Sequence, residues 1–387
     1  MLIASAGLCQ IGSNLARPLV SYKVLALGGD AAAVGLIAAA YALLPVVIAL
    51  WLGRVTDRSS SLRGTIVAGT VLLAVGPFLL SGAPSLLLIG VASAVLGLGQ
   101  LCFTIAGQAA IARFLPLNQM DTAFGWFTAA FALGQLVGPL LAGVLMGAGQ
   151  GARAASRLTD ANTALILAGA ICMFAVPAAF GASVKRRKTR PTAKATFPKV
   201  ATASMVSLLS TPTVKANMAA SLALLATTDI LVAFLPLLGE ENGVPPLMVG
   251  VLLAIRAGAS ISSRLLLPVL LSHWSRPALV TSSLAGAAIP LAFLPSIFEI
   301  PLLAGALLAI AGFFLGLGQP LTMTLVSQAV PPASRGAALA LRLLGNRLGQ
   351  VTLPLAAGLL AAPAGPGGSV WMSSAVLIAA CIKRPRK

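Results

Sequence analysis

Asp229 is the only carboxylate within the long apolar stretches of this 387-residue chain. When its stretch is aligned with the first stretch of the chain, DILVAF falls on RPLVSY and Asp229 falls on Arg17. Burial among apolar groups disfavours the charged form of a carboxylate, so such a group is a candidate for taking up and releasing a proton. The sequence therefore predicts proton exchange at Asp229. The alternative is a permanent structural ion pair with Arg17, Arg256 or Arg347.

Three arginines also lie near the middle of apolar stretches, namely Arg17, Arg256 and Arg347. A guanidinium group binds a carboxylate or a phosphate through two parallel hydrogen bonds. The excess of positive over negative charge therefore predicts an anionic group on a small-molecule ligand. The alternative for Arg347 is a place in a polar seam between two halves of the protein, formed by Gly345–Gln350.

Uncharged polar side chains gather in three of the apolar stretches. They are Gln10 and Asn14 in the first, Gln100, Thr104 and Gln108 in the fourth, and Gln319, Thr322 and Gln328 in the tenth. In the first two stretches their spacing places them on one face of a helix. Three polar faces would form the wall of a water-filled cavity that binds a small molecule. The alternative is that each residue hydrogen-bonds a neighbouring helix.

The stretches that must hold these residues are long enough to cross a membrane. Hydrophobic residues make up 58% of the chain and charged residues 9%, whereas a soluble domain carries about 25% charged residues. A helix needs about 20 apolar residues to cross the hydrocarbon core of a bilayer. Breaks at Gly, Pro and charge clusters give twelve stretches, at 2–27, 32–52, 65–81, 85–114, 122–146, 161–184, 213–238, 246–271, 278–294, 301–330, 336–362 and 370–382. We predict an all-α membrane protein with twelve transmembrane helices, with ten or eleven as the alternatives because the last stretch is short.

The basic residues are distributed as in a membrane protein and not as in a nucleic-acid-binding protein. The net charge is +18, but most Lys and Arg residues fall in alternate loops, in the central run Lys185–Lys188 and at the C-terminus. Only Lys23, Arg153 and Arg157 are assigned to the other set of loops, which carries most of the acids. Short basic loops stay in the cytoplasm, so both termini and the central linker are predicted to be cytoplasmic. The basic run is expected to contact anionic lipid headgroups of a bacterial inner membrane.

The chain offers no catalytic or metal-binding set of residues. Its four cysteines stand singly in apolar segments, its one histidine lies in a loop, and no Walker A phosphate-binding sequence occurs. Nucleophilic catalysis requires a nucleophile beside a base, and a metal site requires several ligands together. We therefore expect no enzyme activity, no cofactor and no metal.

The chain contains an internal repeat. GQLVGPLLAG at Gly134–Gly143 recurs as GQVTLPLAAG at Gly349–Gly358, 215 residues later, and GLGQ at Gly97–Gln100 recurs at Gly316–Gln319. A chain that repeats at half its length consists of two similar halves. The predicted division is a six-helix bundle over 1–184, a basic linker over 185–212 and a second six-helix bundle over 213–387. Two parallel repeats in a membrane are the architecture of a transporter that exposes a central site to alternate sides.

One motif follows the second apolar stretch. Gly53, Asp57 and Arg58 resemble the G-x-x-x-D-R-x-G-R loop signature of the major facilitator superfamily, although the second glycine is missing. The resemblance implies that this loop latches the two halves of the transporter together in the outward-facing state. The alternative is an ordinary charged turn.

A second motif lies in the fifth stretch. Gly125, Gly134, Gly138 and Pro139 fit the G(x8)G(x3)GP(x2)G pattern of antiporters in this superfamily, except that Ala142 replaces the last glycine. Proline bends a helix and glycine permits close helix packing. The eleventh stretch keeps Gly349 and Pro354. The alternative is generic packing of small residues.

The resemblance implies a monomeric twelve-helix transporter that works by alternating access and resembles drug/proton antiporters. One departure is Ser93, at a position of the fourth helix where those antiporters commonly carry an arginine. The leading hypothesis is proton-coupled efflux of a small organic compound. The alternative is uptake or facilitated transport of a small organic anion, and a third hypothesis is a non-transporting sensor or assembly subunit.

Overall fold

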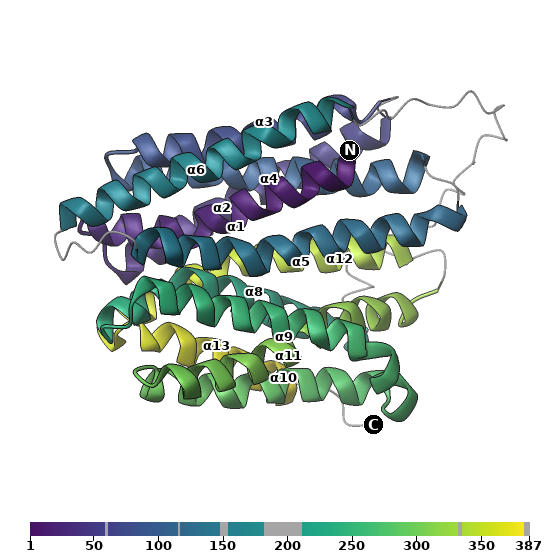
Figure 1. Ribbon diagram of the computed structural model, residues 1–387. Coiled ribbons are helices and arrows are strands. Elements are labelled where there is room, and N and C mark those ends of the chain that lie inside the picture. Colours follow the sequence, from purple (N-terminus) through teal and green to yellow (C-terminus); the bar gives the residue numbers. More distant parts are fainter. Residues whose placement is uncertain (59–60, 115–116, 148–153, 182–210, 332–334, 383–387) are drawn as a thin grey trace. The chain divides into compact units, whose positions relative to one another are not determined.

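The computed structural model describes residues 1–58, 61–114, 117–147, 154–181, 211–331 and 335–382. Twelve α-helices make up nearly all of this part of the chain (Figure 1). In sequence order they are α1 (Leu2–Ala26), α2 (Ala31–Arg58), α3 (Arg63–Gly82), α4 (Leu86–Phe114), α5 (Leu117–Gly147), α6 (Ala154–Gly181), α8 (Pro212–Glu241), α9 (Pro246–His273), α10 (Arg276–Phe293), α11 (Pro301–Gln328), α12 (Arg335–Ala364) and α13 (Gly367–Ile382). The prediction of an all-α fold with twelve helices is confirmed.

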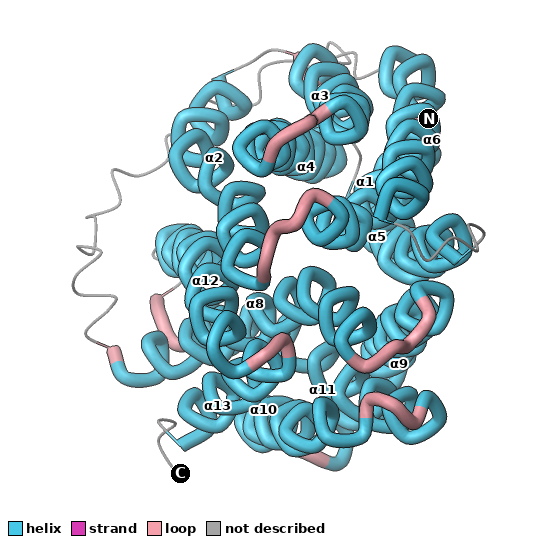
Figure 2. Tube along the Cα trace, turned by 90° about the vertical axis from the view of Figure 1, so that its left-hand side faces the viewer, coloured by secondary structure: helices cyan, strands magenta, loops and turns pink. Residues whose placement is uncertain are grey.

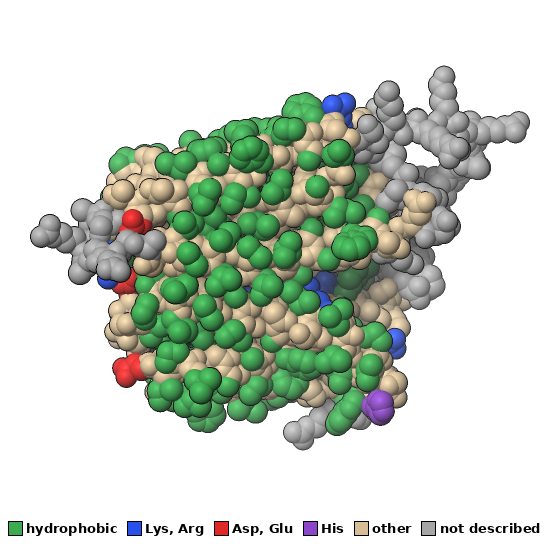
Figure 3. Space-filling view, viewed as in Figure 1, with side chains coloured by type: hydrophobic (Ala, Val, Ile, Leu, Met, Phe, Trp, Pro, Cys, Tyr) green, Lys and Arg blue, Asp and Glu red, His purple; other side chains and the backbone are tan. Residues whose placement is uncertain are grey.

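Nine helices of the described chain are long and apolar enough to cross a membrane. The others are α1 and α12, which carry many of the polar residues singled out above, and α13, which has 16 residues. The sides of the helices carry many exposed hydrophobic residues, such as Leu302 at 84%, Leu87 at 78% and Phe174 at 76% exposure. Figure 3 shows hydrophobic side chains spread over these sides, with the acidic residues near helix ends. Lipid is the solvent that suits such a surface.

The chain divides into two compact units. Unit 1 comprises Met1–Thr189 and Val232–Ala254, and unit 2 comprises Arg190–Leu231 and Ile255–Lys387. The end of α8 and the start of α9 thus belong with α1–α6. Within each unit the helices pack side by side, as the view along the bundles shows (Figure 2). The linker predicted over 185–212 lies almost wholly outside the described residues, and the division at 184 and 213 stays a prediction.

In unit 1, α1 packs against α5 and α6, α3 against α4 and α6, and α2 against α4. Gly97 permits the contact between α4 and α2, because a Cβ at this position would collide with the carbonyl oxygen of Tyr41. Gly316 has the same role in unit 2, since its Cβ would lie 2.5 Å from the carbonyl oxygen of Ser260 on α9. The repeated GLGQ segment therefore makes the same kind of helix contact in both units.

Two assignments from the sequence are corrected. Gly53–Arg58 was expected in a loop but forms the last turns of α2, since it contains no proline to end the helix. The side chains of Gly53, Asp57 and Arg58 lie outside the described residues. Lys23 was assigned to an outer loop but lies in α1 and is 1% exposed. The apolar stretch around Lys23 continues the helix, and the lysine finds partners inside the bundle.

Candidate functional site

The polar residues of α1 and α4 meet in unit 1. Nε2 of Gln10 donates to Oε1 of Gln100 at 3.1 Å, and Nε2 of Gln100 donates to Oε1 of Gln10 at 3.2 Å. Nδ2 of Asn14 donates to the carbonyl oxygen of Gln10 at 2.8 Å. Gln10 is 2% exposed and Asn14 8%. Buried amides pair because an unpaired polar group away from water is costly. The two helices present one continuous amide cluster, which we call the Gln10 cluster.

Two other predicted residues lie apart from this cluster. Gln108 is exposed on α4, so the polar face of that helix does not continue as a buried wall. The guanidinium of Arg17 lies 5.1 Å from the ring centroid of Tyr41 on α2, in a cation–π contact. Arg17 is half-buried, consistent with a side chain that covers an aromatic ring.

The glycines of α5 hold this helix against the Gln10 cluster. A Cβ at Gly134 would lie 2.5 Å from the backbone carbon of Gln10, and one at Gly138 would lie 2.6 Å from that of Asn14. A Cβ at Gly125 would meet nothing within 4 Å, so the first glycine of the motif makes no close contact with the described atoms. Two of the three motif glycines thus position α1.

Pro139 and the glycine after it contact α9. A Cβ at Gly250 of α9 would lie 2.5 Å from the carbonyl oxygen of Pro139 and 3.0 Å from Cα of Gly143. The backbones of α5 and α9 therefore cross in direct contact. Proline within a helix leaves a carbonyl without its usual partner and bends the helix. The motif shapes α5 for two neighbours, α1 and α9.

Asp229, the carboxylate predicted to exchange protons, lies in unit 2 and forms a hydrogen bond with α12. Nε2 of Gln350 donates to Oδ2 of Asp229 at 2.6 Å, and Oε1 of the same Gln350 accepts from Nη1 of Arg347 at 2.9 Å. The amide thus bridges a carboxylate on α8 and a guanidinium on α12. From the sequence alone, Gln350 is predicted only as part of a polar seam. Its spacing of three residues from Arg347 on one helix face was the signal for this bridge.

A second polar cluster of unit 2 centres on Gln319. Nε2 of Gln319 donates to the carbonyl oxygen of Ser221 at 2.8 Å. Nη2 of Arg342 donates to Oε1 of Gln319 at 2.8 Å and to Oγ1 of Thr322 at 3.2 Å. Arg342 is 6% exposed; it has no role in the predicted site, although a charged residue within an apolar helix is a signal that could have identified it. This Gln319 cluster joins α8, α11 and α12, as the Gln10 cluster joins α1 and α4.

The remaining predicted residues of unit 2 lie where helices contact one another. Arg256 on α9 is 2% exposed. Its backbone carbonyl lies where a Cβ at Gly312 of α11 would collide with it. A Cβ at Gly349 would collide with the side chain of Leu222 on α8, and Pro354 is buried in α12. Leu222 occupies the position of α8 that corresponds to Gln10 of α1 in the DILVAF–RPLVSY alignment. Gly134 and Gly349 therefore make equivalent contacts in the two units.

Lys23 is a buried cation that the sequence pattern does not reveal. Its Nζ donates to the carbonyl oxygens of Leu80 at 2.6 Å and Ser81 at 2.8 Å, and to Oδ1 of Asn162 at 2.7 Å. The two carbonyls lie in the last turn of α3, where backbone oxygens lack helical partners and the helix dipole attracts a cation. Three bonds satisfy the three donors of an ammonium group. Lys23 thus fastens α1 to α3 and α6.

Ser93 stands where a family antiporter would carry an arginine. It is 3% exposed, and its hydroxyl has no hydrogen-bond partner among the described atoms. Within the same described residues, no three His, Cys, Asp or Glu side chains lie close enough to hold a metal ion.

Several solved structures share this fold. A mutant of the nucleoside transporter NupG has 16% identity and a TM-score of 0.78, covering 98% of this chain and 96% of that one. A bacterial homolog of the human lysosomal transporter Spinster, in an inward-facing and unoccupied conformation, has 14% identity and a TM-score of 0.77, covering 99% and 95%. A D-xylose-proton symporter has 16% identity and a TM-score of 0.75, covering 98% and 95%. At these identities the likeness concerns the fold.

The family assignment comes from the sequence itself. No curated protein matches the chain significantly. The sequence model of the Major Facilitator Superfamily matches residues 2–336, which is most of the chain. Members of this family are multi-pass membrane transporters and not enzymes. The repeat, the twelve helices and the glycine contacts agree with that match, and the chain belongs to the Major Facilitator Superfamily.

Proposed function

We propose that this chain is a secondary transporter that exports a small organic compound in exchange for protons, by alternating access. The observation that carries the proposal is the bridge from Asp229 through Gln350 to Arg347. Proton coupling requires a titratable group whose charge state changes an interaction between moving elements. The hydrogen bond of Asp229 supports this role because it joins two different helices, α8 and α12.

The charge on Asp229 sets the strength of this contact. A hydrogen bond to an ionised carboxylate is worth about 1.5–3 kcal/mol, more than one between neutral groups. A proton on Asp229 weakens the bond from Gln350 and releases part of the constraint on α12. Arg347 donates a hydrogen bond to the same amide group of Gln350. A weaker bond between Gln350 and Asp229 would therefore also affect the contact of Arg347 on α12. Loading and unloading a proton would thereby alter helix packing in unit 2.

The two amide clusters support a polar small molecule as the substrate. In unit 1, Gln10 and Gln100 supply both donors and acceptors. In unit 2, Gln319 does so as well, and Arg342 adds a fixed positive charge. Such groups recognise hydroxyl, amide and anionic substituents. Two structural neighbours bear the names of a nucleoside transporter and a D-xylose-proton symporter, which are transporters of small polar compounds. They support the class of substrate through the shared fold only.

The alternative is uptake or facilitated transport of a small organic anion without proton exchange. It is favoured by the buried arginines of unit 2, Arg256 and Arg342, which are 2% and 6% exposed. In that case Asp229 is the structural counter-charge of the arginines. Three further parts of the proposal are expectations from the family resemblance. They are the gating role of Gly53, Asp57 and Arg58, the monomeric state and the inner-membrane location.

The test uses purified protein in vesicles. A ligand screen by thermal stabilisation first identifies a compound that raises the unfolding temperature, since a ligand bound to the native state stabilises it. Proteoliposomes that contain the purified protein and carry an imposed proton gradient then receive that compound. We expect the compound to dissipate the gradient with the native chain and not with Asp229→Asn. The matched control is Glu299→Gln, an exposed carboxylate before α11.

Two results would contradict proton coupling. One is gradient-driven transport by Asp229→Asn at the native rate. The other is compound movement by the native chain with no proton movement, combined with competition by small carboxylates, which would favour the anion transporter. If Asp229→Asn folds poorly but Asp229→Asn with Arg347→Gln regains stability, the carboxylate has the structural role.

A further inference from the structure

Two buried residues of α12 in unit 2 carry polar atoms without a hydrogen-bond partner. Arg342 is 6% exposed and Asn346 is 5% exposed. Nε of Arg342 and Oδ1 of Asn346 form no hydrogen bond with any described residue. The two residues are four positions apart and share one face of the helix, yet they do not bond each other. Because a buried polar atom without a partner is costly, a third group is needed at this face of α12.

The positive charge of Arg342 also lacks an anionic partner. Its Nη2 donates to the carbonyl oxygen of Gln319 at 3.1 Å, to Oε1 of the same residue at 2.8 Å and to Oγ1 of Thr322 at 3.2 Å. All three acceptors are uncharged. A buried charge is best stabilised by an opposite charge that also hydrogen-bonds it. The missing group is therefore an anion.

Unit 1 shows which residues the helix contact itself requires. The two repeats, GQLVGPLLAG with GQVTLPLAAG and GLGQ with GLGQ, align the helices of the two units without gaps. At the positions of interest this alignment pairs Arg342 with Phe127, Asn346 with Phe131 and Thr322 with Phe103.

In unit 1 these positions hold aromatic rings in contact. The ring centroids of Phe103 on α4 and Phe127 on α5 lie 6.2 Å apart, and those of Phe127 and Phe131 lie 5.0 Å apart. In unit 2 the equivalent of the first contact is the hydrogen bond from Arg342 to Thr322. The same helix contact thus forms with apolar rings in one unit and with polar groups in the other. Packing alone does not require an arginine and an asparagine at these positions.

The packing beside Asn346 is loose. A Cβ at Gly345 would meet only the end of the Met218 side chain, at 3.3 Å. Gly345 and Gln319 are both half-buried, so the two buried residues adjoin accessible parts of unit 2. A small molecule can therefore approach this face of α12 after modest movement of a flexible side chain.

We propose that Arg342 and Asn346 bind the carboxylate end of the transported compound. Nε–H of Arg342 donates to a carboxylate oxygen, as a guanidinium commonly does. Oδ1 of Asn346 can only accept, so the ligand must bring a donor one helical turn away. A hydroxyl or ammonium group on the carbon next to the carboxylate supplies it. The substrate class is thus a small hydroxycarboxylate or aminocarboxylate.

This assignment rests on the proposed transport function, because the ligand is taken to be the substrate. It does not depend on the direction of transport or on proton exchange. Binding to the purified protein and proton movement in proteoliposomes are separate measurements, so each hypothesis can fail without the other.

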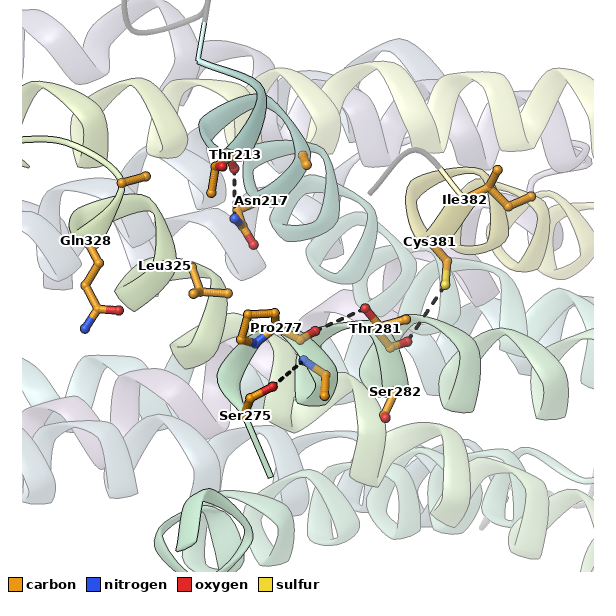
Figure 4. A pocket seen from close by; sticks show the side chains of 13 residues that line it. Thr213, Asn217, Ser275, Pro277, Thr281, Ser282, Leu325, Gln328, Cys381 and Ile382 are labelled. Carbon is orange, nitrogen blue, oxygen red and sulfur yellow. Dashed lines mark hydrogen bonds between the residues drawn. The ribbon is translucent and has the colours of Figure 1, made fainter. Parts of the chain in front are cut away.

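A cavity of about 1110 Å³ at one end of the unit 2 helices is a separate feature (Figure 4). None of its lining residues is charged, and none belongs to the Gln319 cluster. Asn217 and Leu325, which line it, lie about one helical turn from Ser221 and Thr322 of that cluster. A carboxylate would find no cation among the lining residues, so the anion is assigned to Arg342.

The experiment compares three compounds that share a three-carbon skeleton. Lactate carries a hydroxyl group and alanine an ammonium group next to the carboxylate, whereas propionate carries neither. Each is titrated into the purified full-length protein in detergent, and affinity is taken from the rise of the unfolding temperature. Sodium chloride at equal ionic strength corrects for general binding of anions to a chain of net charge +18.

Two variants remove the proposed contacts one at a time. Arg342→Gln removes the charge and Asn346→Leu removes the acceptor. Arg276→Gln on α10 is the control for loss of a charge, and Thr352→Leu on α12 is the control for a polar residue changed to leucine, since both residues are exposed. If Arg342→Gln does not fold, Arg342→Phe with Asn346→Phe introduces the residues of unit 1 and removes the buried charge.

We expect the native chain to bind lactate or alanine roughly fivefold more tightly than propionate, the value of one neutral hydrogen bond. Asn346→Leu should abolish this preference and keep the affinity for propionate. Arg342→Gln should weaken binding of all three compounds by roughly tenfold to a hundredfold, because a bond to a charged group is lost. Both control variants should bind as the native chain does.

Three results would overturn the subsite. They are equal affinity of the native chain for the three compounds, unchanged affinity in Arg342→Gln or in the double phenylalanine variant, and binding of no carboxylate at all. The last result would mean that ordered water satisfies the two atoms. Any of them together with compound-driven proton movement leaves the proposed function standing. Binding through Arg342 without proton movement keeps the subsite and contradicts proton exchange.

Discussion

Nε2 of Gln350 on α12 donates a hydrogen bond of 2.6 Å to Oδ2 of Asp229 on α8. The same amide accepts a bond of 2.9 Å from Arg347, so one uncharged residue connects a carboxylate and a guanidinium within unit 2. Any change in the charge of Asp229 therefore alters the strength of its hydrogen bond to Gln350, a residue of another helix. This arrangement provides direct tests of coupling.

Replacing Gln350 should weaken coupling more than folding. Gln350→Leu removes the bond to Asp229 and leaves Arg347 without this acceptor. We expect gradient-driven transport in proteoliposomes to fall by roughly tenfold, since a bond to a charged group is worth about 1.5–3 kcal/mol. Thr352→Ala changes an exposed residue of the same helix and serves as the control. Normal gradient-driven transport by Gln350→Leu would show that the bridge is not part of coupling.

The glycines of α5 can be compared by one identical substitution. Gly134→Ala places a methyl group 2.5 Å from the backbone of Gln10, which forces α1 and α5 apart. Overpacking of this kind costs about 1–3 kcal/mol. Gly125→Ala meets nothing within 4 Å and should leave stability unchanged or raise it by up to about 1 kcal/mol, because alanine favours helix. Thermal unfolding in detergent measures both; equal unfolding temperatures would mean that the helices do not pack as described.

Substitutions of Gln10 and Gln100 in unit 1 can show whether this amide pair binds substrate or only holds two helices together. Gln10→Leu or Gln100→Leu alone leaves a polar partner unsatisfied and should destabilise the protein by about 1–3 kcal/mol. The double variant removes both amides and should recover much of that loss. If the cluster binds substrate, the stable double variant nevertheless fails to respond to the stabilising compound. A double variant that still responds in full would restrict the pair to a structural role.

Lys23 should prove important for stability. Lys23→Met fits the volume but leaves the carbonyls of Leu80 and Ser81 and the amide oxygen of Asn162 without their donor. We expect a loss of about 3 kcal/mol or more from the free energy of unfolding, since each unsatisfied buried group costs about 1–3 kcal/mol.

A double-mutant cycle isolates the bond between Lys23 and Asn162. Lys23→Met and Asn162→Leu are combined, and the coupling energy is taken from the three variants. Thr163→Ala, at an exposed neighbouring position of α6, is the control and should leave the unfolding temperature unchanged. Additive effects of Lys23→Met and Asn162→Leu would argue against the bond.

Most of the fold follows from local features of the sequence. The twelve helices begin and end within a few residues of the predicted stretches in most cases, because apolar length and breaks at Gly and Pro determine where a membrane helix can run. Gly53–Arg58 is an exception, since its charges favour a loop in the sequence, whereas the segment contains no proline and continues α2. Helix ends are harder to predict from the sequence where polar residues occur, because such residues are found both in loops and in helix turns at the headgroup region.

The candidate site was predictable in its residue types but less so in its contacts. Asp229, Arg256 and Asn14 were identified because charged and amide groups are costly inside apolar helices. Their partners were harder to find: Gln350 had been assigned only to a polar seam, and Arg342 had received no role. Gln108 shares a helix face with Gln100 in the sequence, yet it is exposed in the structure.

Lys23 is the clearest case in which the tertiary structure, and not the local sequence, determines the position of a residue. Its charge and its place near the end of the first stretch agreed with a loop, and the carbonyls that bind it come from a helix nearly sixty residues away. Membrane insertion, helix number and the repeated glycines are set by residues close together in the chain, so sequence alone was sufficient for them. Other contacts depend on how helices that are distant in sequence rotate and cross, and only the folded arrangement reveals them. These contacts are the pairings of Gln10 with Gln100, of Gln350 with Asp229 and of Lys23 with α3.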